Sequence, residues 1–194
     1  LDSIMMAGKQ GGGMSADRLW LWNIYRDRSG TIWIGTSNGL YHAEQEKGNN
    51  GSAGKMHFIH YLPEPMKAGE SDNGVGRIFE DKNNQFWVGS LSGLKKFYPR
   101  TGKFEAYTPK SGEPAAIGKN QWISSIAEDY DGDLWISCLE NGLYRINKER
   151  TSLVTFTNTS DNLFGLKSIN INSLLVDAGG NLLLSTDKGL HKLI

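Results

Sequence analysis

One pattern occurs four times in this chain and constrains its fold more than any other feature of the sequence. Each copy runs from an aspartate through a turn glycine and a tryptophan to a Gly-Leu pair, in the first copy Asp27, Gly30, Trp33, Gly39 and Leu40. The aspartates are 54, 48 and 48 residues apart, at Asp27, Asp81, Asp129 and Asp177. A period of this length, filled with short strand-like runs, is typical of propeller blades or a related array.

Each copy of the pattern predicts a small antiparallel sheet. The aspartate should accept hydrogen bonds from backbone N–H groups of a hairpin turn, and the residue three positions later should have a positive φ. Asn84 takes that position in the second copy, where asparagine is the best replacement for glycine. The tryptophan strand is apolar on both faces, as a middle strand between stacked blades would be. The predicted fold is therefore all-β, an array of four blades with four strands each.

The four copies divide the chain into blades within a single domain, residues 1–194. The last copy stops after its third strand, and an additional strand-like run, residues 1–6, precedes the first copy. We expect this run to supply the outer strand of the last blade, which would remove an open sheet edge. A small closed ring, half of an eight-bladed dimer and an arc of a larger propeller all remain open. The expected blades are residues 19–61, 75–107, 122–157, and 170–194 together with 1–6.

The composition argues against several classes of function. Twenty-one Lys and Arg residues balance 21 Asp and Glu residues, so the chain lacks the basic excess that is usual in nucleic-acid-binding proteins. No apolar run is long enough to span a membrane. Cys138 is the single cysteine, which excludes an internal disulfide, and we expect it to be a small buried residue in a strand. Because the chain starts with Leu1 rather than methionine, we expect a fragment of a larger protein.

Candidate binding residues stand where the copies differ from one another. Trp20 and Trp122 lie seven residues before their aspartates, where the other copies have Gly74 and Asn170. We expect a position this variable to be free of packing constraints and to lie near the mouth of a central channel. Flat aromatic faces at such a mouth can stack on sugar rings. Trp22 is a weaker candidate of the same kind, and the alternative is that these tryptophans pack against neighbouring loops.

Polar candidates lie four residues before each aspartate, at Asn23, Arg77, Ser125 and Ser173. Arg77 is the only charged residue among them and could bind the carboxylate or sulfate of an acidic sugar. Its alternative role is that of a solvated channel residue or a partner of Glu80. Zinc-type spacings, a Gly-x-Ser-x-Gly motif and a phosphate loop are all missing from the sequence. We therefore expect no catalytic residue, no metal ion and no cofactor.

The repeat resembles that of the two-component regulator propeller family. The residues that carry the resemblance are Val75, Ile78, Glu80, Asp81, Trp87, Gly89, Gly93 and Leu94, with their counterparts in the other copies. The resemblance covers nearly the whole chain, and it departs from the family pattern at Asn84, at Leu183 and by one extra residue before Gly142. Proteins with this repeat are mostly bacterial membrane sensors, many of them hybrid two-component histidine kinases, and several recognise oligosaccharides.

The resemblance implies a non-enzymatic, periplasmic sensing module whose kinase lies outside this chain. Its expected ligand is an oligosaccharide or another small polar molecule, bound by Trp20, Trp122, Arg77, Trp22 and Asn23. The alternative is a scaffold for protein–protein contacts or for a homodimer, without a small-molecule ligand. A propeller lyase or hydrolase is a less favoured alternative, because fold alone does not determine function. Neither nucleic acid nor membrane is an expected partner of these residues.

Overall fold

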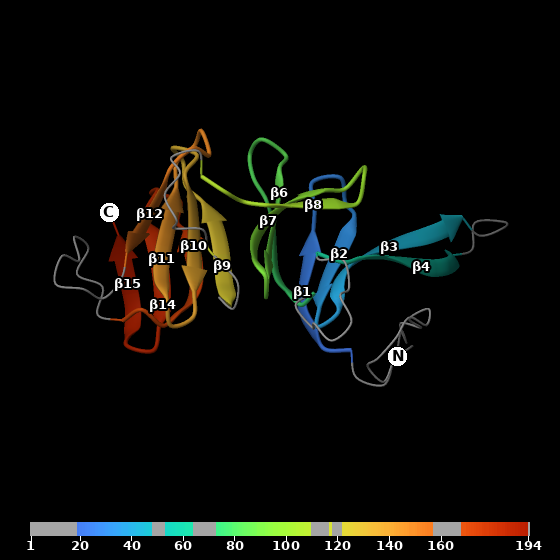
Figure 1. Ribbon diagram of the computed structural model, residues 1–194, viewed down its shortest axis with the longest axis horizontal. Helices are drawn as coiled ribbons and strands as arrows, with labels where there is room; N and C mark the ends of the chain where they lie inside the picture. The colour runs from blue at the N-terminus through green and yellow to red at the C-terminus, as the bar shows by residue number, and fades with distance from the viewer. Residues whose placement is uncertain are drawn as a thin grey trace.

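The computed structural model describes residues 19–47, 53–63, 73–109, 117, 122–156 and 168–193. All regular secondary structure in these residues is β-strand. The strands form four antiparallel sheets that follow one another along the chain (Figure 1). Each sheet holds one copy of the repeat, so the predicted all-β array of four blades is confirmed. The described part of the chain contains no helix with the length and hydrophobicity that crossing a membrane requires.

In every blade the strands pair in chain order. The first blade contains β1 (Leu21–Arg26), β2 (Ile32–Thr36), β3 (Gly39–Lys47) and β4 (Ala53–Tyr61). The second contains β5 (Val75–Glu80), β6 (Phe86–Ser90), β7 (Gly93–Tyr98) and β8 (Lys103–Ala106). The third contains β9 (Ile123–Glu128), β10 (Leu134–Cys138), β11 (Gly142–Ile146) and β12 (Leu153–Phe156). The last contains β13 (Ile171–Val176), β14 (Leu182–Thr186) and β15 (Gly189–Leu193). Residues 1–6, the predicted fourth strand of that blade, lie outside the described residues.

The aspartate turn folds as its sequence predicts and makes one further bond. The residue three positions after the aspartate has a positive φ in every copy, including Asn84 at 60°. Asp81 Oδ1 accepts hydrogen bonds from Asn83 N and Gln85 N at 2.9 and 3.0 Å. The other carboxylate oxygen, Asp81 Oδ2, accepts from Trp87 Nε1 at 2.9 Å, a bond that the sequence pattern did not suggest. The first and third copies have the same indole–carboxylate bond, at 2.8 and 2.7 Å.

The last copy has a substitute for this bond. Leu183 stands where the other copies have tryptophan, so no indole N–H is present. Instead, Asn181 Nδ2 donates to Asp177 Oδ2 at 2.9 Å. The aspartate carboxylate is therefore held within its own hairpin in all four blades.

The hydrophobic core lies between successive blades. We call the side of a blade that meets the following blade its front face, and the side that meets the preceding blade its back face. At the first junction the front face contributes Trp33 and Leu40, and the back face of the second blade contributes Val75 and Ile78. The close approach depends on a small residue, since a Cβ on Gly35 would lie 2.5 Å from the carbonyl oxygen of Val75. The repeat tryptophans are buried in these junctions, as predicted.

The blades form an open arc. Inner strands β1, β5, β9 and β13 contact one another in sequence order. Figure 1 shows the first and last blades at opposite ends of the molecule, with β15 at one end and β3 and β4 at the other. Of the arrangements that the sequence leaves open, the structure therefore excludes a closed ring formed by these four blades alone.

Candidate functional site

The binding residues suggested by the sequence lie at or near the start of the inner strands, and the structure brings some of them together. We call this set the inner-strand cluster: Trp20, Trp22, Asn23, Arg77 and Trp122. Trp22 from β1 and Trp122, just before β9, have ring centroids 4.8 Å apart and ring planes at 78°. This edge-to-face arrangement is one of the preferred geometries of aromatic pairs. The two rings belong to the first and third blades, so they meet across the second.

The second blade makes room for this pair with two glycines, Gly74 and Gly76. A Cβ on Gly74 would lie 2.6 Å from Trp22 Cζ3, and one on Gly76 would lie 3.1 Å from Trp122 Cζ2. A side chain at position 74 would therefore displace the Trp22 ring. The expectation that packing does not constrain this repeat position is wrong for Trp122 and Gly74, because the Trp122 ring packs over Gly76 and the Trp22 ring fills the space beside Gly74. The sequence does show Gly74 and Gly76 at the repeat positions where other copies have tryptophan. Which glycine faces which tryptophan, however, depends on how the blades stack.

Trp20 lies outside the aromatic pair. Its side chain is 63% exposed, although its backbone is tied to Ser37 by hydrogen bonds at 2.9 and 3.1 Å. Trp122, at the same repeat position, is half-buried because it packs onto the preceding blade. The described residues include no blade before the first, so the Trp20 ring faces solvent.

Arg77 bridges the second and third blades beside the tryptophan pair. Its Nη1 donates to the carbonyl oxygen of Gly76 at 2.8 Å, and its Nε donates to the carbonyl oxygen of Ser124. Burial lowers the pKa of Arg77 from its usual value, yet arginine remains protonated at neutral pH. The alternative pairing with Glu80 is not observed, since Glu80 Oε2 accepts from Arg28 N at 2.9 Å. No carboxylate among the described residues forms an ion pair with Arg77.

Asn23 contributes an unused acceptor to the cluster. Its Oδ1 is buried, and no described residue donates a hydrogen bond to it. A buried polar atom without a partner costs about 1–3 kcal/mol, so a donor that reached this oxygen would be stabilising. The equivalent residue of the third blade, Ser125, is satisfied differently, because its Oγ accepts from Leu174 N at 3.1 Å.

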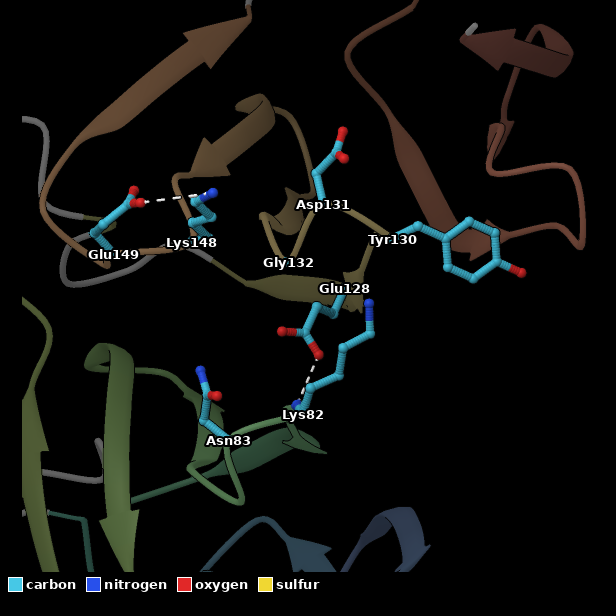
Figure 2. A pocket seen from close by; sticks show the side chains of 8 residues that line it. All are labelled: Lys82, Asn83, Glu128, Tyr130, Asp131, Gly132, Lys148 and Glu149. Atoms are coloured by element: carbon cyan, nitrogen blue, oxygen red, sulfur yellow. Dashed lines mark hydrogen bonds and ion pairs between the residues drawn. The ribbon is translucent and has the colours of Figure 1, made fainter.

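A groove of about 320 Å³ lies at the opposite end of the second junction, beside the aspartate turns (Figure 2). Two of its carboxylates already have partners within the groove, a backbone N–H for Glu128 and a lysine ammonium group for Glu149. Lys82 N donates to Glu128 Oε2 at 2.7 Å, and Lys148 Nζ lies 3.9 Å from Glu149 Oε1. A ligand in this groove would have to replace these contacts, so the inner-strand cluster is the better candidate site.

Comparison with known proteins adds family relationships to this geometry. Three segments of the chain, residues 15–38, 69–92 and 117–140, match the model of a family described as the two component regulator propeller. Histidine kinase P4 of Formosa agariphila is 31% identical over 84 residues. That alignment covers 42% of this chain and 6% of the kinase.

Solved structures with the same fold include extracellular sensor domains. The extracellular domain of the hybrid two component system BT4673 from B. thetaiotaomicron is 26% identical, with a TM-score of 0.66. The match covers 89% of this chain and 21% of that one. The corresponding domain of BT3049 from the same organism is 21% identical, has a TM-score of 0.62 and shows the fold alone. The match to BT3049 covers 90% of this chain and 21% of the BT3049 domain. This chain therefore spans about a fifth of the length of each of these two solved relatives.

Proposed function

Since this chain carries repeats of the two-component regulator propeller family, as its sequence pattern predicts, we propose that it is the sensing module of a two-component signal-transduction protein. Its solved relatives are extracellular domains, which supports an extracytoplasmic and, in our proposal, periplasmic location. The curated relative is a histidine kinase, so in this proposal the signal passes to a kinase outside these residues.

The proposed ligand is an oligosaccharide, and the proposed site is the inner-strand cluster. The observation that carries this proposal is the pair of Trp22 and Trp122 near the start of the inner strands, together with Trp20, which is 63% exposed and holds the repeat position of Trp122 in the first blade. Sugar rings present apolar C–H faces that pack against indole rings, while their hydroxyls need polar partners. Asn23 Oδ1 would accept a hydrogen bond from a hydroxyl, and Arg77 would bind a carboxylate or sulfate.

A thermal-shift screen against neutral and acidic oligosaccharides tests this function. A ligand at a hundred times its dissociation constant should add about 2.7 kcal/mol to the free energy of unfolding. For a ligand found in this way, Trp20→Ala and Trp122→Ala should each weaken binding at least tenfold in calorimetry. Tyr130→Ala is the matched control, because Tyr130 is a similarly exposed aromatic residue at the other end of β9. Unchanged affinity in both tryptophan variants would reject this site.

An alternative function, a scaffold for protein–protein contacts, is favoured by exposed apolar residues on the outermost blades. Ile24 of the first blade and Leu190 of the last are 68% and 73% exposed. A stable assembly without any response to oligosaccharides would favour the scaffold over the sensor. Neither function includes catalysis, so turnover of a glycan or a lactone by the purified chain would contradict both.

A further inference from the structure

One repeat position carries an aromatic ring in the first two blades and only a methyl group in the third. This position lies two residues before the repeat aspartate, and it is occupied by Tyr25, Phe79 and Ala127 in turn. Tyr25 packs into the hydrophobic cluster of the first junction and Phe79 into that of the second. We call the contact between the third and last blades the third junction. Ala127 belongs to its cluster but brings no ring to it.

The apolar wall that faces the missing ring is nevertheless present. At the first junction Tyr25 packs with Ile78 and Phe86 of the following blade, and its ring centroid lies 6.5 Å from that of Phe86. The residues at the same two repeat positions of the last blade are Leu174 and Leu182, which are both buried in the third junction. The third junction therefore has the wall of a ring site without the ring.

A groove of about 400 Å³ lies at this position, at the end of the inner strands opposite to the inner-strand cluster. Its apolar lining includes Phe79 of the second blade, Ala127 of the third, and Leu174 and Val176 of the last. All four residues belong to the second and third junctions, inside the described arc. The volume is in the range of small-molecule sites, which are typically lined by apolar side chains with a few polar groups.

We propose that this groove binds a small aromatic carboxylate. The ring of the ligand takes the place at the third junction that Tyr25 and Phe79 fill at the other two. Phe79 also lines the groove and adds an aromatic contact to the aliphatic wall. This site is distinct from the inner-strand cluster, so the proposal goes beyond the sensing of an oligosaccharide and does not depend on it.

A backbone donor is available for one end of the ligand. Asp177 N donates to Asn181 O at 2.9 Å, and successive N–H groups of an antiparallel strand alternate in direction, so the N–H of Val176 points away from β14. The equivalent N–H at the first junction, that of Glu80, donates to Tyr25 Oη at 3.2 Å. Ala127 has no oxygen with which to replace that of Tyr25. A carboxylate oxygen of the ligand would accept from Val176 N instead.

Two cations that line the groove, Lys82 and Arg28, favour an anionic ligand. Lys82 Nζ donates to the carbonyl oxygen of Asp129 at 2.5 Å, and Arg28 Nη1 donates to that of Asp81 at 2.7 Å. In the described part of the chain, neither side chain forms an ion pair with a carboxylate. Both groups have further N–H donors, so either can bind a carboxylate without losing its backbone partner.

The two carboxylates that line the groove are already bound by other groups. Glu80 Oε2 accepts from Arg28 N at 2.9 Å. Glu128 accepts from Arg150 Nη2 at 3.1 Å and from Lys82 N at 2.7 Å. Binding of a ligand to the Lys82 ammonium group leaves all of these bonds in place. The ammonium group is therefore the part of the groove that selects for a negative charge.

Benzoate is the probe that tests this site, and the valines of the chain report where it binds. The purified chain is labelled with heavy nitrogen at its valines, Val75, Val88, Val154 and Val176, and followed by amide correlation NMR. Benzoate at millimolar concentration should shift the amide peak of Val176 and leave the other three in place. The Val176→Ile variant identifies that peak. Phenol and cyclohexanecarboxylate, which lack the charge and the aromatic ring respectively, should each bind more weakly than benzoate.

Two substitutions separate the ring from the charge. Ala127→Phe should abolish the response, because the new side chain fills the groove as Phe79 does at the second junction. Lys82→Gln, at an exposed position, should weaken benzoate binding about tenfold and leave phenol binding unchanged, since it removes one charged hydrogen-bond donor. Lys188→Gln is the charge-matched control, because Lys188 is exposed in the turn between β14 and β15, and it should bind benzoate like the unmodified chain.

Three results would overturn the proposal. The first is a Val176 peak that benzoate does not move, and the second is a response that persists in folded Ala127→Phe. The third is equal binding of benzoate and phenol, or equal losses in the two lysine variants, because the groove would then not recognise the carboxylate. None of these results bears on the oligosaccharide proposal, whose site lies at the other end of the inner strands.

Discussion

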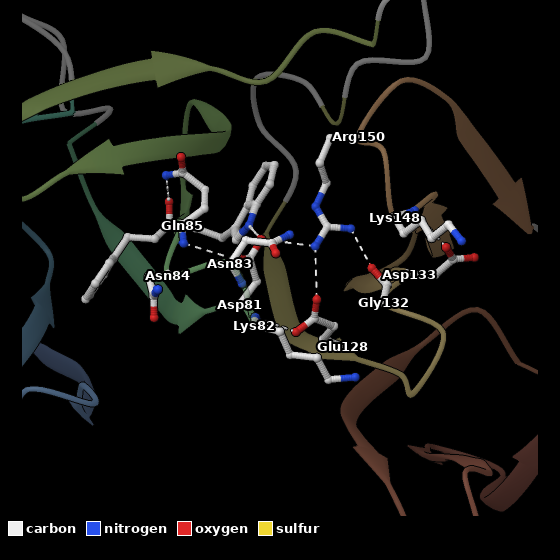
Figure 3. Close-up of polar contacts among 12 residues, drawn as sticks. Asp81, Lys82, Asn83, Asn84, Gln85, Glu128, Gly132, Asp133, Lys148 and Arg150 are labelled. Atoms are coloured by element: carbon white, nitrogen blue, oxygen red, sulfur yellow. Dashed lines mark hydrogen bonds and ion pairs between the residues drawn. The ribbon is translucent and has the colours of Figure 1, made fainter.

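Arg150 Nη2 lies 3.0 Å from Asp81 Oδ2 and joins the third blade to the aspartate turn of the second (Figure 3). The same nitrogen lies 3.1 Å from Glu128 Oε1, and Arg150 Nη1 donates to the carbonyl oxygen of Gly132 at 2.7 Å. The Arg150 side chain is 12% exposed, and those of Asp81 and Glu128 are 1% and 5% exposed. Arg150 also has a φ of 59°, a conformation that is uncommon for residues other than glycine. This arginine therefore links two blades at the point where the turn carboxylate is buried.

Replacing this arginine should destabilise the protein strongly. Arg150→Met would leave Asp81 and Glu128 buried without their cation, which should lower the free energy of unfolding by about 3–5 kcal/mol. Lys148→Met is the control, because Lys148 is 66% exposed and only 3.9 Å from its partner Glu149. The control should change the free energy of unfolding by less than about 0.5 kcal/mol in denaturant titrations. Equal effects of the two substitutions would contradict a structural role for Arg150.

The stability of the fold should decrease in acid. Burial by itself raises the pKa of Asp81, but hydrogen bonds from Trp87, Gln85 and Arg150 outweigh it, so its pKa lies below the usual value. A carboxyl group with a lower pKa in the folded state stabilises the fold above its unfolded pKa, which is about 3.9 for aspartate. This contribution disappears as the pH falls through the folded pKa, so the free energy of unfolding should decrease below about pH 4.

Denaturant titrations over a pH series would measure this decrease. Asp81→Asn should reduce the slope of stability against pH in this range, whatever its effect on stability at neutral pH. Asp131→Asn, at an exposed position of the neighbouring turn, should reduce this slope less than Asp81→Asn does. If both variants reduce the slope of stability against pH by the same amount, Asp81 is not the group responsible for the acid sensitivity.

The tryptophan pair should respond to a single methyl group on the blade between its members. Gly74→Ala would place its Cβ 2.6 Å from Trp22 Cζ3, so the ring must move. We expect a loss of about 1–3 kcal/mol in the free energy of unfolding and a changed near-ultraviolet circular dichroism spectrum. In a Trp22→Ala background the same substitution should cost much less, because the clashing ring is gone and only the end of the flexible Leu91 side chain, whose Cδ1 would lie 3.0 Å from the new Cβ, remains close. A double-mutant cycle without coupling between positions 22 and 74 would contradict the observed packing.

Cys138 should be unreactive in the folded protein. Its side chain is fully buried, as the sequence predicts, and burial raises the pKa of its thiol to about 12. Because the thiolate is the nucleophilic form, alkylating and disulfide reagents should not modify the native chain near pH 8. Complete modification in denaturant provides the control for reagent and protein. Rapid modification of the native chain would mean that this strand opens more easily than its burial suggests.

Within a blade, the sequence predicted most of what the structure contains. The aspartate, the positive-φ residue and the tryptophan strand act over a few neighbouring positions, so their roles can be read from local patterns. Even the exception at Asn84 followed from the conformational preferences of asparagine. The indole bond from Trp87 to Asp81 was missed, because a repeated tryptophan suggests only burial when its ring orientation is unknown.

The candidate site could be predicted only as a set of positions. Trp20 and Trp22 are two residues apart in sequence, yet Trp22 pairs with Trp122 from the third blade, whereas Trp20 remains exposed. Which tryptophans pair depends on the stacking of blades and on the glycines between them. Arg77 was proposed as a ligand contact, and the structure adds its two backbone carbonyl partners.

By itself, therefore, the sequence determined the blade, its turns and the number of repeats, because these depend on side-chain alternation and on backbone preferences within one repeat. Only the tertiary structure decided the contacts between blades. Arg150 reaches Asp81 across 69 residues, and Leu190 is exposed although its counterparts are buried. The physical reason is that these outcomes depend on which faces meet. Identical repeat positions are buried at a junction and exposed at the end of an arc, and no local pattern distinguishes the two.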